Sequence, residues 1–195
     1  MRLTYEEIIE IMDANAGYLS MDTPENLYKF LTNLFALNRG SIVEFCYNDL
    51  KYPIVDKLEK IPEDIFFACK SNFNTWTAGS HVIQIDAGAF ASCALDTIDL
   101  SKAKITKLND ATFGHSFVKK VILPEGLKTI GESTFRGSKL EEVYIPSTVE
   151  SIGMWSFSKC NNLKKVHLCK DSIAQNKLKI DKDDFNIIKP KVVWY

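Results

Sequence analysis

The chain has 195 residues, of which 46% are hydrophobic and 25% charged, and its formal net charge is −1. This length is enough for one large domain or two small ones. A near-neutral charge excludes a basic nucleic-acid binder of the usual kind. No apolar run approaches the roughly 18–20 residues that a membrane helix requires. We therefore expect neither nucleic acid nor a membrane as a partner.

The N-terminus and the cysteines both predict a cytoplasmic protein. Glu6, Glu7, Glu10 and Asp13 give the N-terminus neither the basic start nor the apolar stretch of a signal peptide. The five cysteines are odd in number and include no C-x-x-C pair, so no disulfide framework is predicted. In a reducing compartment they would be free thiols that pack as small hydrophobic side chains.

Residues 1–49 carry two helix signals. A capping box at Thr4–Glu7 predicts one helix that ends at Gly17, and Thr23-Pro24 predicts the start of a second. The segment has 3 basic and 8 acidic side chains, a net charge of −5. We interpret these helices as an N-terminal cap over the domain that follows. Partner binding by their acidic surface is the alternative.

From about residue 50 the sequence repeats with a period of 22–24 residues. Each repeat has one aliphatic residue eight positions before a phenylalanine, another five before it, and a small residue three after it. The phenylalanines are Phe66, Phe90, Phe113, Phe135 and Phe157. Agreement of five repeats at four positions excludes coincidence, and a fixed period in this range is typical of a solenoid.

Each phenylalanine is followed by a run that ends in alternating apolar and mostly polar residues. Such alternation predicts a strand with one buried face. The connections between runs are too long for tight hairpins, so the strands should pair in parallel through right-handed coils. One coil buries too few large side chains to offset its own ordering entropy, so stacked coils share a core and need caps.

Residues 140–163 resemble the repeat of the BspA-type leucine-rich repeat family. The stretch L-E-E-V-Y-I-P-S-T-V-E-S-I-G-M-W-S-F-S-K-C-N-N-L follows the family pattern L-x-x-V-x-I-P-x-x-V-x-x-I-G-x-x-A-F-x-x-C-x-x-L. The resemblance extends over roughly residues 50–170 and departs upstream, where Asp86 stands in place of the usual glycine. It implies an α/β solenoid with a parallel β-sheet on one face. It also implies adhesion or protein binding.

Residues 171–195 are interpreted as a C-terminal capping segment, in which Val192-Val193-Trp194-Tyr195 predicts a closing strand over the last coil. Residues 160–195 hold 8 lysines against 4 aspartates, a net charge of +4. The two ends of the chain are therefore oppositely charged, which leaves a homo-oligomer built head to tail as an alternative. Termination at a closing strand suggests a complete, stand-alone solenoid.

No sequence motif indicates an enzyme. The P-loop, G-x-S-x-G, H-E-x-x-H and G-x-G-x-x-G patterns do not occur. Asp181-K-Asp183-Asp184 begins like a calcium loop, but Phe185 stands at its third ligand position. The histidines lie at different phases of the repeat, and three cysteines occupy one core position. We predict no catalytic residue, no metal site and no cofactor.

The outward side chains of the sheet follow from the alternation of side chains along a strand. One row contains Thr75, Thr97, Lys120, Glu142 and Lys165, and the other contains Thr77, Asp99, Ile122, Tyr144 and His167. Neighbours in a row should touch, because parallel strands lie about 4.8 Å apart. Alternating Lys and Glu alone are typical of a solvated charge ladder. Ile122 beside Tyr144 instead has the character of a binding hot spot.

A partner-binding surface is predicted from these rows and one tryptophan. Its residues are Lys120, Ile122, Glu142, Tyr144, Lys165, His167, Asp99 and Trp155. Trp155 is included because the equivalent residues of the other repeats, Gly88, Ala111 and Ser133, are all small. The alternative for Trp155 is packing against the C-terminal cap.

The sequence favours a non-enzymatic module that binds an intracellular partner protein through the solenoid surface. One version is a phage-type protein that inhibits a host enzyme or defence factor. Two alternatives remain open. One is a surface adhesin, as the family resemblance implies, and the other is a structural subunit of a larger assembly joined through the polarised ends.

Overall fold

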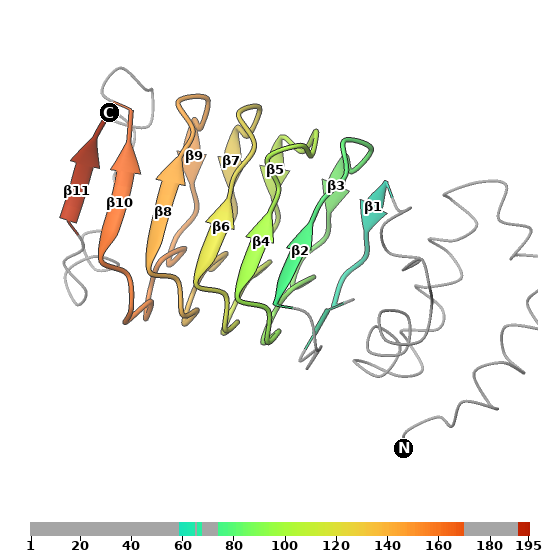
Figure 1. Cartoon of the computed structure of the whole chain (residues 1–195), viewed down its shortest axis with the longest axis horizontal. Helices are drawn as coiled ribbons and strands as arrows, with labels where there is room; N and C mark the ends of the chain where they lie inside the picture. The colour runs from blue at the N-terminus through green and yellow to red at the C-terminus, as the bar shows by residue number, and fades with distance from the viewer. Residues whose placement is uncertain (1–58, 65, 68–73, 170–190) are drawn as a thin grey trace, which may run out of the picture.

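The computed structural model describes residues 59–64, 66–67, 74–169 and 191–195 (Figure 1). The predicted N-terminal helices in residues 1–49 lie outside these ranges, as does most of the predicted capping segment at residues 171–195. Both domain assignments therefore stay predictions. None of the described residues forms a helix of the length and hydrophobicity that crossing a membrane requires.

Six strands form one parallel sheet along a stack of coils. In spatial order they are β11 (Lys191–Trp194), β10 (Lys165–Leu168), β8 (Glu142–Ile145), β6 (Lys120–Ile122), β4 (Thr97–Asp99) and β2 (Thr75–Thr77). Strands β2, β4, β6, β8 and β10 lie in the runs where apolar–polar alternation predicts them. Strand β11 lies where a closing strand is predicted, and it pairs in parallel with β10.

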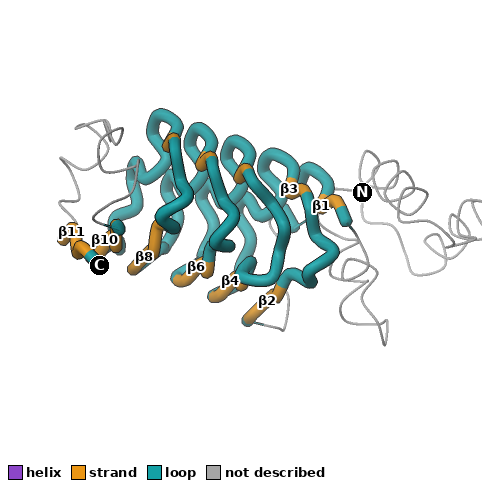
Figure 2. Tube along the Cα trace, turned by 90° about the horizontal axis from the view of Figure 1, so that it is seen from above, coloured by secondary structure: helices purple, strands orange, loops and turns teal. Residues whose placement is uncertain are grey.

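Two-residue strands run along the opposite side of the coils, as Figure 2 shows from above. They are β1 (Lys60–Ile61), β3 (Gln84–Ile85), β5 (Lys107–Leu108), β7 (Thr129–Ile130) and β9 (Ser151–Ile152). Strand β1 pairs with β3, and β5, β7 and β9 form a three-stranded sheet. Each strand ends at the aliphatic residue five positions before a phenylalanine. The sequence pattern predicts an apolar residue there but no strand.

The five repeat phenylalanines form a continuous stack through the core. Each is at most 1% exposed. Their ring centroids lie 4.6, 5.5, 5.3 and 5.3 Å apart in chain order, with neighbouring planes within 23° of parallel. Offset aromatic pairs at such distances contribute about 0.5–1.5 kcal/mol beyond the burial of their area. The recurring phenylalanine is therefore the spine of the solenoid.

Small residues three positions after the last four repeat phenylalanines form a second buried column, which consists of Cys93, Ser116, Ser138 and Cys160. Cys93 and Cys160 have no exposed surface. The Cys160 Sγ lies 2.8 Å from the Phe135 carbonyl oxygen and 3.6 Å from the Ser138 Oγ. Ser116 is only 1% exposed, and its Oγ has no hydrogen-bond partner in the described part of the chain. The column thus contains one unsatisfied hydroxyl.

The strand register confirms the outward rows of the long sheet. Paired residues run Thr75–Thr97–Lys120–Glu142–Lys165 in one row, and Thr77–Asp99–Ile122 and Tyr144–His167 in the other. The residue between the two rows is buried on each of these strands, for example Val121 on β6 and Val143 on β8. Ile122 and Tyr144 therefore lie on neighbouring strands and on the outward face.

Candidate functional site

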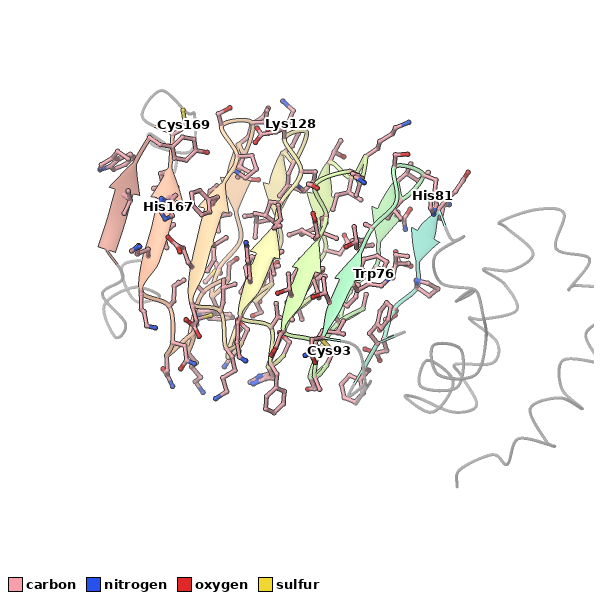
Figure 3. The ribbon with its side chains drawn as sticks, in the orientation of Figure 1. Trp76, His81, Cys93, Lys128, His167 and Cys169 are labelled. Atoms are coloured by element: carbon pink, nitrogen blue, oxygen red, sulfur yellow. The ribbon has the colours of Figure 1, made fainter. Side chains whose placement is uncertain are left out.

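The outward side chains of the long sheet become larger from β4 to β8. Strands β2 and β4 present threonines and Asp99, whereas β8 and β10 present Tyr144 and His167. Figure 3 labels His167 on β10. Ile122 lies on β6, between the strands with short side chains and the strands with aromatic rings. Tyr144 and Ile122 line the same groove, which lies between β6 and β8.

Tyr144 is held against its neighbour by ring stacking. Its ring centroid lies 3.8 Å from that of His167, and the two planes are 9° from parallel. Tyr144 is 56% exposed, whereas His167 is only 8% exposed. Alternation predicts an open position for His167, and this expectation is wrong. The stacked Tyr144 ring lies on one side of His167, and Val193 of β11 is its register partner on the other.

Glu142 joins this pair through its carboxylate. Its Oε1 forms a hydrogen bond with the His167 Nε2 and lies 3.5 Å from the Lys165 Nζ. The hydrogen bond with His167 lowers the pKa of the Glu142 carboxyl, and the positive charge of Lys165 adds to this effect against partial desolvation. The carboxylate is thus ionised at neutral pH and holds the edge of the His167 ring.

Lys120 differs from the neighbouring lysines. Lys119 forms an ion pair with Asp96 at 2.9 Å, and Lys164 forms one with Glu141 at 3.3 Å. Glu142 is the register partner of Lys120, yet its carboxylate bonds to β10 instead. Among the described residues, no ion pair or side-chain hydrogen bond involves the Lys120 ammonium group. Lys120, Glu142 and Lys165 therefore do not form a continuous charge ladder, because it is interrupted at Lys120.

Tyr195 borders this surface at the C-terminal ends of β8 and β10. Its amide donates a hydrogen bond to the Leu168 carbonyl oxygen at 3.1 Å, and its hydroxyl donates one to the Ile145 carbonyl oxygen at 2.9 Å. The side chain thus reaches from the end of β11 to β8, where its ring centroid lies 6.5 Å from that of Tyr144. Burial raises the pKa of the Tyr195 hydroxyl, and the negative charge of Glu125 adds to this increase.

These side chains enclose a half-open groove of about 750 Å³ between β6 and β8, within the usual range of ligand pockets. Four predicted site residues line it: Lys120, Ile122, Glu142 and Tyr144. Glu125, Pro146 and Tyr195 also line it, although the sequence pattern does not single them out. Tyr195 was recognisable only as an aromatic residue in a closing strand.

The other predicted site residues lie outside the groove lining. Lys165 and His167 support it from β10 through Glu142 and Tyr144. Asp99 is the register partner of Ile122, and its carboxylate accepts a hydrogen bond from the Ser101 amide at 2.9 Å. The structure therefore brings seven of the eight predicted residues to one face, whereas Trp155 follows β9 on the opposite side of the coils.

Trp155 occupies a strained turn. Its φ angle is +56°, close to those of the equivalent residues Gly88, Ala111 and Ser133. This left-handed conformation is unfavourable for a bulky side chain. Trp155 is 41% exposed, and the Arg136 Cζ lies 6.0 Å from the centre of its ring. The predicted alternative, packing against the C-terminal cap, concerns a segment that lies largely outside the described residues.

The described side chains form no assembled metal site. No group of three or more His, Cys, Asp or Glu residues in the described ranges has a geometry that could hold a metal ion. The calcium-like stretch at residues 181–185 lies outside those ranges. The groove instead offers an aromatic ring, an aliphatic floor and separate charges. That chemistry fits recognition of another molecule.

Parallel strands contributed one per coil, stacked over a phenylalanine spine, define a leucine-rich repeat solenoid. The family model of the BspA type leucine rich repeat region matches residues 40–168 in six copies. The chain belongs to the BspA-type leucine-rich repeat family, so the resemblance and the fold class predicted from the sequence are confirmed. The match begins at residue 40, upstream of the residue 50 expected from the repeats.

Several solved bacterial structures are similar to this chain. The pneumococcal vaccine antigen PcpA is 22% identical with a TM-score of 0.51, and the similarity covers 59% of this chain and 31% of that one. A T. pallidum leucine-rich repeat protein is 23% identical, with a TM-score of 0.41 and coverage of 57% and 52%. A Bacteroides ovatus leucine-rich repeat protein is 19% identical, with a TM-score of 0.39 and coverage of 74% and 47%.

This chain thus spans less than two thirds of each of these proteins. The likeness to PcpA shows the fold alone. No curated protein sequence matches the chain. Leucine-rich repeats generally mediate protein–protein interaction, and proteins of this kind are typically non-enzymatic binding modules.

Proposed function

We propose that the protein binds a partner protein through the outward face of the long sheet, centred on the groove beside Tyr144. The observation that carries this proposal is that an exposed aromatic ring stacks on a buried side chain. Tyr144 is 56% exposed, yet it is stacked on His167, which Glu142 holds in turn. A rigid exposed tyrosine loses little conformational freedom on binding, and tyrosine is enriched in interface hot spots.

We propose further that the partner is intracellular and that the chain acts in the cytoplasm, as a phage-type inhibitor of a host enzyme or defence factor. The support for this finer proposal is the general protein-binding role of leucine-rich repeats, together with the opposite net charges of residues 1–49 (−5) and residues 160–195 (+4), which can steer a charged partner. Fractionation of cells that produce the protein naturally tests the location. Recovery of the chain from the cell surface would contradict the cytoplasmic proposal and favour an adhesin.

Co-purification with matched surface variants tests the binding face. The tagged wild-type chain, Tyr144→Ala, Ile122→Asp and the control Phe117→Ala are compared in a lysate of the native host. Phe117 is 53% exposed and does not line the groove, so it matches Tyr144 in exposure alone. We expect one host protein to co-purify in stoichiometric amount with the wild type and Phe117→Ala.

The same host protein should be lost from Tyr144→Ala and Ile122→Asp. Truncation of a central aromatic hot spot costs about 2 kcal/mol or more, roughly a thirtyfold loss of affinity. Thermal melts confirm that each variant is folded before capture. Retention of the host protein by both groove variants would contradict the proposed binding face, and so would its loss from Phe117→Ala.

A further inference from the structure

We infer that the groove selects an extended peptide segment of the partner in which an aromatic residue is flanked by one acidic and one basic residue. This inference rests on the proposed function and specifies the chemistry that the groove recognises. It draws on three properties of the groove: at one end a cation and at the other a carboxylate, neither with a side-chain partner among the described residues, and an open ring face between them.

The positive end is Lys120, at the start of β6. The adjacent Lys119 is neutralised by Asp96, and the carboxylate of Glu142 is used by Lys165 and His167. The exposed Lys120 ammonium lines the groove with no ion-pair partner among the described residues. An acidic side chain of a bound segment would supply that partner without displacing an existing one.

The negative end is Glu125, which follows β6 beyond Pro124. Its side chain is exposed, lines the groove and has no ion pair or hydrogen bond to its carboxylate within the described ranges. Tyr195 lines the groove as well, and the charge of Glu125 helps to raise the pKa of its hydroxyl. A basic side chain of the bound segment fits this end.

The middle of the groove is apolar and aromatic. His167 stacks in parallel on one face of the Tyr144 ring, so the other face of that ring points away from β10. Ile122 lies on the neighbouring strand and lines the same groove. An aromatic side chain can therefore contact both residues and bury its ring against them.

The spacing of the two charges fits a short extended ligand. Lys120 and Glu125 are five residues apart, so at most about 17 Å of chain separates them. A bound strand rises about 3.3 Å per residue, so a segment of about five residues is long enough to reach both charges. The ligand would therefore place its charged residues about two positions before and after the aromatic residue.

Four short fluorescein-labelled peptides test this inference. Each has a central phenylalanine in a serine–glycine sequence, and the flanking residues are Glu and Lys, Lys and Glu, Glu and Glu, or Lys and Lys. Their dissociation constants are measured by fluorescence polarisation at low salt for the wild-type chain, Lys120→Glu, Glu125→Lys and Lys104→Glu. Lys104 is exposed and does not line the groove, so Lys104→Glu controls for net charge.

We expect the wild-type chain to bind the two mixed-charge peptides about three- to fivefold more tightly than the like-charged ones, the effect of a partly exposed ion pair. Lys120→Glu should shift the preference to the peptide with two lysines, and Glu125→Lys should shift it to the peptide with two glutamates. Lys104→Glu should keep the wild-type preference. Raising the salt concentration should reduce all these differences.

Three results would overturn the inference: equal affinity of the wild type for all four peptides, a preference that neither groove variant changes, and no binding at about 1 mM peptide. These results are distinguishable from failure of the proposed function. If no peptide binds but the host protein is still lost from Tyr144→Ala, the binding face stands and the peptide chemistry is wrong. If capture does not depend on Tyr144, the binding face itself is wrong.

Discussion

Replacing Phe113 and Phe135 by leucine, singly and together, tests whether the phenylalanine stack contributes to stability through its neighbouring pairs. The two rings lie 5.3 Å apart and 11° from parallel, and each also stacks on a second ring on its other side. A single substitution therefore removes two stacked pairs, each worth about 0.5–1.5 kcal/mol. We expect each single variant to lose about 1–3 kcal/mol of the free energy of unfolding.

The double variant should lose less than the sum of the single losses. The pair between Phe113 and Phe135 is counted in both single variants but exists only once, so the difference should be about 0.5–1.5 kcal/mol. Phe90 and Phe157 supply the matched control, because among the described residues these two rings are not stacked on each other and share no stacked neighbour. Their leucine substitutions should be additive within about 0.3–0.5 kcal/mol.

Urea denaturation followed by circular dichroism measures all seven chains, with the denaturant dependence checked for two-state behaviour. Strict additivity in the neighbouring pair would refute the reasoning, because it would mean that ring-to-ring contact carries no stability of its own. Equal coupling in both pairs would refute it as well. In that case the coupling would reflect the cooperativity of the whole stack of coils.

Three smaller predictions concern single side chains. Ser116→Ala should leave the free energy of unfolding unchanged or raise it by up to about 1 kcal/mol in urea denaturation, because the buried Ser116 hydroxyl is unsatisfied. Ser138→Ala should lower the free energy of unfolding by about 1 kcal/mol, because the contact with the Cys160 thiol is lost. Trp155→Gly should be about 1 kcal/mol more stable than Trp155→Ala in thermal melts, since only glycine tolerates φ of +56° freely. Glu142→Gln should be less stable than the wild type by under about 1 kcal/mol at neutral pH, since solvent screens the pair. Because the pKa of Glu142 is lowered in the folded state, the stability that Glu142 adds over Gln is fully present above the ordinary value of 4.5 and is lost as the pH falls through the folded-state pKa. An equal stability difference between the two chains at pH 7 and pH 3 would contradict the ion pair.

The repeat could be predicted from the sequence because contacts in a solenoid occur at a fixed chain separation. The stacked phenylalanines and the paired strands are each one period apart, so the spacing that reveals the repeat also identifies which residues touch. The outward rows follow from the same spacing, since the alternation within a strand is unaffected by its neighbours. This is why Ile122 and Tyr144 could be placed side by side without coordinates.

The details of the groove could not be predicted, because they depend on contacts that the period does not specify. The Tyr195 hydroxyl bonds to a carbonyl oxygen 50 residues away, across the intervening strand β10. The burial of His167 depends on β11, whose sequence does not follow the repeat. The choice of Glu142 between Lys120 and Lys165 depends on side-chain geometry, since both lysines are its register partners.

The two rows on the outward face alternate with the buried row along every strand of the repeat, and this arrangement separates two kinds of mutation. An exchange at the Lys120, Ile122 or Tyr144 position alters the groove while leaving the phenylalanine stack intact. An exchange at Val143, which is buried in the core and does not line the groove, alters the scaffold instead. Selection can therefore change the binding surface of such a protein one coil at a time, without destabilising the core that supports it.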